Sequence, residues 1–253
     1  MKSRMKLDMA LLTASILLII ILVVSSFMTG NITAIQKLSD TLTLEEFTDH
    51  LDRRIPALMD SYNVPGLVIA LVHAGEIAWI QAYGHADLET GRLMTTDTYC
   101  RVQSISKSVT AWGVLKLAEQ GEIDLDAPVI QYLRDWQFPP SSYPTANITV
   151  RQLLSMTAGL PLGTVDVIYS PEEAMPSLED KLSAEAIPFQ KGGSSFYYSN
   201  VSFNLLELLI EKVTKRDFAE YMETEILLPL DMTRSGFTWS SDFNPAYRWC
   251  LWR

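Results

Sequence analysis

The sequence predicts an α+β protein in which an antiparallel sheet packs against helices and a mostly helical insertion covers one edge of the sheet. Two apolar, β-rich runs at 67–73 and 76–83 flank the tight turn His73-Ala74-Gly75, which indicates a hairpin. From residue 104 onward, apolar residues recur mainly at helical spacing. With 253 residues, 48% of them apolar, the chain is also long enough to bury a core.

Residues 1–30 are expected to form an N-terminal membrane anchor or signal segment. Lys2, Arg4 and Lys6 precede an uncharged run over residues 9–28, and about 20 apolar helical residues span the hydrocarbon layer. Basic flanks stay on the cytoplasmic side, so the rest of the chain is expected outside a cell membrane that it crosses once. The run ends in VVSSFMTG, a poor cleavage site, which favours a retained anchor over a cleaved signal peptide that would leave the protein secreted.

The remainder divides into a polar linker, residues 31–42, and a domain over residues 43–253. The domain begins with a helix, since apolar residues recur at helical spacing between Leu44 and Met59. The hairpin follows, and its nearly continuous apolar character predicts that both of its faces are covered. The stretch LETGRLMTTDT after the hairpin is expected to be a surface loop.

Four helices are expected in the second half of the chain, over residues 104–120, 148–161, 202–213 and 218–227. Gly121 stands in the position of a C-terminal cap for the first of them. Residues 162–195 are rich in turn-forming residues, and a long irregular segment inside a compact protein often lines a functional site.

Charge and residue spacing argue against two classes of function. The net charge of −10, with no basic run beyond the first residues, opposes nucleic-acid binding through phosphate neutralisation. Cys100 and Cys250 lie far apart, and His50, His73 and His85 form no zinc-ligand cluster. We therefore expect no nucleic-acid partner, no metal and no cofactor.

The stretch RVQSISKSVTAW places Ser104 and Lys107 three residues apart at the expected start of a helix. Positions i and i+3 share a helix face, so the amine can lie beside the hydroxyl and remove its proton as it attacks. Burial or neighbouring positive charge would favour the neutral amine that this role needs. The unpaired N–H groups at a helix start would stabilise the developing oxyanion. The alternative is that Ser104 caps the helix and Lys107 is a solvated residue of its first turn.

The stretch FYYSNVSFNLLELL places Tyr198 and Asn200 just before another expected helix. A phenol and an amide two residues apart on an extended segment can point the same way, as a proton carrier and a hydrogen-bonding group for a substrate. The alternative is a plain helix start, with Ser199 or Asn200 as the cap and Tyr198 packed beneath it.

Together and in this order, these stretches resemble the serine β-lactamase and penicillin-binding-protein superfamily, especially its class C β-lactamase-like serine hydrolases. The resemblance covers roughly residues 43–239. It includes the hairpin VPGLVIALVHAGEIAWIQAYGHADLETG, the nucleophile motif SISK, the block ITVRQLLSMTAGLP, the second motif YSN and the stretch ILLPLDMTRSGF.

The resemblance implies a β-lactamase-like fold and an acyl-enzyme mechanism without a cofactor. Ser104 would attack a carbonyl, and Lys107 would take or relay its proton. Tyr198 would carry the proton to the leaving group, and Asn200 would hold the substrate amide and orient Lys107. Whether Lys107 or Tyr198 is the base stays open. The expected partner is a small-molecule or peptide substrate: a β-lactam, a D-Ala-D-Ala peptide or an ester.

The sequence departs from this family after Asn200, because no K-T-G or H-x-G motif follows. That third motif lies on a strand that supplies the second oxyanion donor, and losing one such donor costs about two to three powers of ten in rate. We therefore expect a C-terminally truncated member whose last strands are missing. The alternative functions are an impaired homologue that at best binds cell-wall peptides or a partner, and a purely structural ectodomain.

Overall fold

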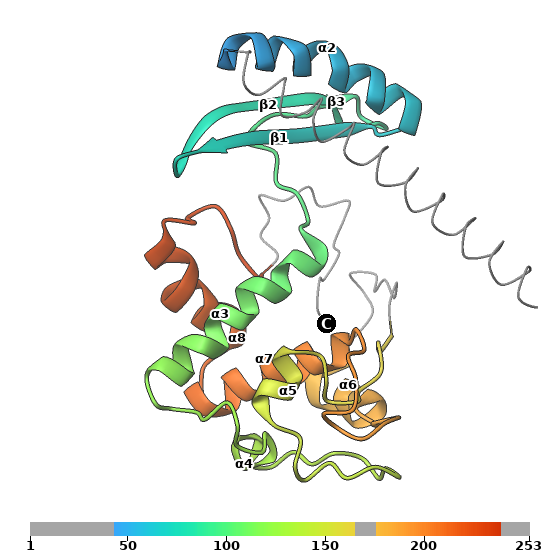
Figure 1. Cartoon of the computed structure of the whole chain (residues 1–253), viewed down its shortest axis with the longest axis vertical. Coiled ribbons are helices and arrows are strands. Elements are labelled where there is room, and N and C mark those ends of the chain that lie inside the picture. The colour runs from blue at the N-terminus through green and yellow to red at the C-terminus, as the bar shows by residue number, and fades with distance from the viewer. Residues whose placement is uncertain (1–42, 165–175, 239–253) are drawn as a thin grey trace, which may run out of the picture. The chain divides into compact units, whose positions relative to one another are not determined.

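The computed structural model describes residues 43–164 and 176–238, and it divides the chain into two compact units (Figure 1). The first unit ends at Thr98 and the second begins at Tyr99. In the described parts of the chain, no helix combines the length and the apolar character that a membrane crossing needs. The expected anchor and linker, residues 1–30 and 31–42, lie outside these parts, so the domain boundaries stay predictions.

The first unit opens with the predicted helix, α2 (Leu44–Tyr62). Thr43 and Glu46 form a capping box, in which the Glu46 N–H donates to Thr43 Oγ1 at 3.2 Å and the Thr43 N–H donates to Glu46 Oε2 at 2.8 Å. These bonds satisfy N–H groups that the start of a helix leaves unpaired. Ile55 and Met59 are the buried residues of α2, which packs on strand β2.

The sheet of this unit is antiparallel, with the order β1–β2–β3 (Figure 1). Its strands are β1 (Gly66–His73), β2 (Glu76–Asp87) and β3 (Arg92–Leu93). The predicted hairpin is confirmed, with His73 paired to Glu76 across the turn and positive φ angles at Ala74 and Gly75. Strand β3 lies in the stretch predicted to be a loop, because two residues are too few to show a strand period.

The prediction that both faces of the hairpin are covered does not hold in the described residues. The side chains of β1 and β2 are half-buried or exposed except at Asp87, and Val72 and Ile77 are largely exposed. An apolar run indicates covered faces only where other elements pack on them. Within this unit, the helix that packs on the sheet is α2.

The second unit is helical, and α7 lies at its centre. The bounds of its elements are η1 Gln103–Ile105, α3 Ser106–Glu119, α4 Ile130–Leu133, α5 Val150–Leu154, α6 Leu178–Glu185, α7 Asn200–Thr214, α8 Phe218–Met222, η2 Glu223–Leu227 and η3 Leu228–Leu230. All ten residues over 201–210 are buried. Helix α7 contacts α3, α4, α5, α6 and α8, and therefore forms the core that the other helices surround (Figure 1).

The helix predicted to begin at Ser104 starts differently in the structure. The α-helix α3 begins at Ser106, and Ser104 lies in the preceding 3-10 turn η1. Gln103 has a φ of 48°, a left-handed conformation that is uncommon for a residue with a side chain. At the other end, Gly121 follows the cap residue Gln120 and has a positive φ, as predicted.

Two other predicted helices are shorter than expected. The helix predicted over residues 148–161 is limited to α5, because the backbone turns away at Met156 and Gly159, where φ is 54° and 81°. The helix predicted over residues 218–227 is α-helical only in α8. It continues as the π-helical turn η2 and the 3-10 turn η3, a change of hydrogen-bond register that apolar spacing alone does not reveal.

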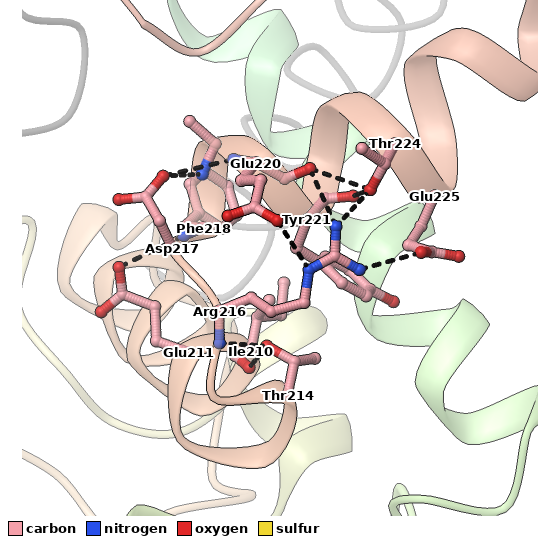
Figure 2. A network of polar contacts seen from close by, with 11 residues as sticks. Ile210, Glu211, Thr214, Arg216, Asp217, Phe218, Glu220, Tyr221, Thr224 and Glu225 are labelled. Atoms are coloured by element: carbon pink, nitrogen blue, oxygen red, sulfur yellow. Dashed lines mark hydrogen bonds and ion pairs between the residues drawn. The ribbon is translucent and has the colours of Figure 1, made fainter.

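A network of polar contacts around Arg216 joins the end of α7 to α8 and η2 (Figure 2). The Arg216 guanidinium donates to Glu220 Oε1 at 3.2 Å, Glu225 Oε1 at 2.9 Å and Thr224 Oγ1 at 2.5 Å. From the same segment, the Tyr221 hydroxyl donates to the carbonyl oxygen of Gly113 in α3 at 3.0 Å. The network thereby connects α7 to the segment that packs on α3. The predicted site residues lie at, or just before, the N-terminal ends of these two helices, α3 and α7.

Candidate active site

The two polar residues of the SISK motif are in direct contact. Lys107 Nζ donates a hydrogen bond to Ser104 Oγ at 3.2 Å. Ser104 is exposed, whereas Lys107 is only 5% exposed. Lysine is almost never this buried unless it is paired, so the alternative of a solvated Lys107 is wrong. Helix α3 has no side-chain cap, and its cap residue is Ile105, so the alternative of Ser104 as the cap is also wrong.

The backbone around Ser104 favours a reactive hydroxyl. The left-handed Gln103 turns the chain just before Ser104, and Ser104 lies in η1, two residues before the first residue of the 14-residue helix α3. The positive end of the helix dipole stabilises negative charge close to it. An anionic oxygen formed at or near Ser104 would therefore be stabilised by its position.

Tyr198 completes this cluster from a segment distant in sequence. Lys107 Nζ lies over its ring, 4.8 Å from the centroid. Hydrogen bonding with Lys107 and Ser104 acts on the pKa of the Tyr198 phenol. Burial raises the pKa of Tyr198, but these hydrogen bonds and the Lys107 charge outweigh it and leave that pKa below its usual value. Tyr198 is 39% exposed, so it is not packed beneath the helix as the alternative required.

The start of α7 places Tyr198 and Asn200. Ser199 is the cap, because its Oγ accepts from the Ser202 N–H at 3.0 Å and donates to the carbonyl oxygen of Pro161 at 2.7 Å. Asn200 is the first residue of the helix, is half-buried, and donates its backbone N–H to the carbonyl oxygen of Leu162 at 3.0 Å. Of the two candidate caps in the sequence, the structure therefore selects Ser199 and leaves the Asn200 side chain free of that role.

Residues 156–162, which follow α5, form hydrogen bonds with the YSN motif and the residues before it. The Tyr197 N–H donates to the carbonyl oxygen of Met156 at 2.9 Å, and the Phe189 N–H donates to that of Gly159 at 3.0 Å. The segment over residues 162–195, predicted to be irregular, contains the helix α6, so that prediction is wrong for 178–185. Its residues 165–175 lie outside the described parts. Its described portion thus packs against 156–162, next to the candidate site.

Sequence reasoning missed Phe203, the second ring close to the Lys107 amine. Its centroid lies 5.8 Å from Lys107 Nζ, and Phe203 is 5% exposed. The signal that was available is its spacing, because Phe203 follows Asn200 by three residues and helix positions i and i+3 share a face.

Together these contacts bring Ser104, Lys107 and Tyr198 into one group of adjacent polar side chains and place Asn200 at the adjacent helix start. Such a group can withdraw a proton from the serine hydroxyl and return it to another atom. Over residues 43–164 and 176–238, no set of three or more His, Cys, Asp or Glu is placed to hold a metal ion. The predicted absence of a metal or cofactor stays a prediction.

Comparison with known proteins identifies the family. The Beta-lactamase family matches residues 51–253, which is most of the chain. The chain belongs to the Beta-lactamase family. The predicted resemblance to class C β-lactamases and penicillin-binding proteins is confirmed.

Two curated relatives show the breadth of this family. Protein flp from Staphylococcus aureus (strain N315) is 26% identical over 189 residues, which cover 74% of this chain and 38% of that protein. Esterase EstB from Burkholderia gladioli is 30% identical over 204 residues, which cover 74% of this chain and 52% of EstB. The chain thus spans about half, or less, of the length of these relatives.

Solved structures show the same fold. The octameric penicillin-binding protein homologue from Pyrococcus abyssi is 27% identical, with a TM-score of 0.61, over 76% of this chain and 44% of that chain. A class C beta-lactamase aligns with a TM-score of 0.64 over 80% of this chain and 54% of its own, at 24% identity, which shows the fold alone. The β-lactamase-like α+β fold, with an antiparallel sheet and helices, is therefore confirmed.

Proposed function

We propose that this protein is a serine hydrolase that forms an acyl-enzyme on Ser104 with esters or peptide-like amides. The observation that carries the proposal is the burial of Lys107 at 3.2 Å from an exposed Ser104 hydroxyl, with the Tyr198 ring centroid 4.8 Å from the same amine. A buried amine beside an accessible serine, with a phenol to relay protons, is what nucleophilic catalysis requires. Membership of a family that includes an esterase supports the same class of reaction.

In the proposed reaction, Ser104 Oγ bonds to the carbonyl carbon as its proton passes to Lys107 or Tyr198. The bond from that carbon to the leaving oxygen or nitrogen then breaks, and Tyr198 delivers a proton to the leaving group. Water hydrolyses the Ser104 ester in a second step, which restores the hydroxyl and releases the acid. Asn200, free of the capping role, would bind the substrate amide.

The exposure of Tyr198 is compatible with several substrate classes. Tyr198 is 39% exposed, so the proton carrier is open to a leaving group from solution. This exposure suits esters, small β-lactams and D-Ala-D-Ala peptides alike. The names of similar proteins include an esterase as well as a β-lactamase. We propose the ester as the first substrate to test, with the β-lactam and the D-Ala-D-Ala peptide next.

We also propose that residues 9–28 anchor the protein in the cell membrane with the hydrolase outside. The support is the uncharged run of that length after a short basic leader. Protease treatment of intact cells tests it: digestion of the C-terminal part, with a small protected N-terminal piece, is expected. Full protection in intact cells but digestion after lysis would contradict the orientation.

The hydrolase proposal is tested by intact-mass analysis of the purified full-length chain after incubation with a fluorophosphonate and, separately, with a penicillin. Wild type should gain one adduct, which peptide mapping should place on Ser104. Ser104→Ala should gain none. The matched control is Ser108→Ala, which removes another exposed serine of the same region, and it should react like wild type.

Each outcome has one reading. The fluorophosphonate adduct is stable and reports only that Ser104 is reactive. Release of the acid from the penicillin adduct supports the hydrolase, and a penicillin adduct that persists supports the alternative of an impaired homologue that binds without turnover. No adduct on a folded protein, shown by its near-ultraviolet circular dichroism, contradicts the assignment of Ser104 as nucleophile.

A further inference from the structure

The position of the Lys107 amine depends on groups outside its own helix. Lysine has a long, flexible side chain that gains rotational entropy in water, so a buried amine must be held by contacts. One contact is local, the hydrogen bond to Ser104 Oγ. Two others are aromatic rings from the start of α7, Tyr198 at 4.8 Å and Phe203 at 5.8 Å from ring centroid to Nζ.

Of these two rings, Phe203 is the one fixed by the core. It is 5% exposed and lies inside α7, among neighbours that are all buried, whereas Tyr198 precedes the helix and is 39% exposed. A phenyl ring has only two rotatable bonds and, once buried in a packed core, keeps its place. Phe203 therefore provides a rigid wall beside the amine.

The ring also acts electrostatically on the amine. The face of an aromatic ring attracts a cation within about 6 Å of its centroid, and the attraction is stronger where water is excluded. The amine of a 5% exposed Lys107 is in such a place. In the route where Lys107 rather than Tyr198 takes the Ser104 proton, this attraction strengthens as the amine gains charge and so favours the transition state over the ground state.

We propose that Phe203 is a positioning residue that holds the Lys107 amine between Ser104 Oγ and the Tyr198 ring and attracts the charge that this amine carries when protonated. The inference rests on the proposed acyl-enzyme function of Ser104. It assigns to the fourth residue of α7 a part in the reaction, although Phe203 carries no group that exchanges protons.

The test compares Phe203→Leu with a matched control, Phe218→Leu, in the full-length chain. Phe218 is also 5% exposed and lies in α8, where its ring packs edge-on against Phe237 at 5.0 Å. Both variants lose a buried ring, so a general packing effect should appear in both. Phe203→Tyr keeps the ring face and serves as the conservative rescue.

The first readout is phosphonylation of Ser104 by the fluorophosphonate, in which the Oγ–P bond forms and fluoride leaves, resolved into a limiting rate and a half-saturating concentration. For Phe203→Leu we expect the limiting rate to fall about tenfold, the size of a desolvated cation–ring contact, with an unchanged half-saturating concentration. Phe218→Leu and Phe203→Tyr should stay within about twofold of wild type. A wild-type rate for Phe203→Leu, an equal loss in Phe218→Leu or no rescue by tyrosine would overturn the inference.

The second readout does not depend on catalysis. Brief labelling with acetic anhydride, followed by peptide mass analysis, measures how accessible the Lys107 amine is relative to Lys116 of the same helix. Labelling of Lys107 should rise several-fold in Phe203→Leu but not in Phe218→Leu, and equal labelling in wild type and Phe203→Leu would refute the positioning role. If wild type forms no adduct on Ser104, the proposed function fails, and this readout still decides whether Phe203 positions the amine.

Discussion

Substitution of Gly159 by alanine tests how the segment 156–162 supports the candidate site. Gly159 has a φ of 81°, and a Cβ atom there would lie 2.2 Å from the backbone carbonyl oxygen of Gln190. Real Cβ atoms do not approach a backbone oxygen so closely, and a backbone atom cannot rotate away as a side chain does. The segment must therefore shift, and with it the hydrogen bond that the Phe189 N–H donates to Gly159 at 3.0 Å.

The magnitude follows from two contributions. A left-handed conformation costs a residue with a side chain about 1–2 kcal/mol, and forced overpacking costs about 1–3 kcal/mol more. Gly121 separates them, because it has a similar φ of 75° but an added Cβ meets nothing within 4 Å. We therefore expect Gly121→Ala to lower the free energy of unfolding by about 1–2 kcal/mol and Gly159→Ala by about 2–5 kcal/mol.

Scanning calorimetry of the full-length chain measures both variants. At about 2–4 °C per kcal/mol for a unit of this size, Gly159→Ala should lower the Tm by clearly more than Gly121→Ala. Acylation of Ser104 should also slow in Gly159→Ala alone, because the same segment accepts the hydrogen bond of Ser199 at Pro161. Equal Tm values for the two variants would refute the close approach to Gln190, and normal acylation in a destabilised Gly159→Ala would refute its link to the site.

Three further outcomes follow from the structure. Because the pKa of Tyr198 is lowered, its phenolate forms at a lower pH than that of an ordinary tyrosine, so the rate of Ser104 acylation should rise with pH along a limb below pH 10. In stopped-flow pH profiles, this rise of the rate with pH should disappear in Tyr198→Phe and remain in Tyr197→Phe. A rise that is unchanged in Tyr198→Phe would show that the Tyr198 phenolate is not its cause. Lys107→Met should slow the phosphonylation of Ser104 by the fluorophosphonate by about two to four powers of ten, while Lys116→Met on the same helix should not. Leu206→Ala in α7, where Leu206 is 0% exposed, should lower the free energy of unfolding by about 2–5 kcal/mol in calorimetry, and a loss below about 1 kcal/mol would contradict a central α7.

Local sequence signals predicted the elements that local forces form. The hairpin follows from two β-rich runs around a turn that Ala74 and Gly75 can adopt, and α7 follows from a long apolar helical pattern. The local sequence signals failed where contacts between distant segments, rather than the spacing of apolar residues, decide the structure. Strand β3 exists because Arg92–Leu93 pair with β2, and the helix predicted over 148–161 ends early because the chain turns to hydrogen-bond with the segment before α7.

The sequence by itself determined the family and the residue types of the candidate site, because motif spacing is a property of the chain alone. The ordered blocks from the hairpin through SISK and YSN to ILLPLDMTRSGF sufficed to name Ser104, Lys107, Tyr198 and Asn200. Whether Lys107 was solvated or buried could not be decided at that level, since burial depends on elements that are remote in sequence. Only the tertiary structure placed the rings of Tyr198 and Phe203, together with the Ser104 hydroxyl, around the amine of a buried Lys107.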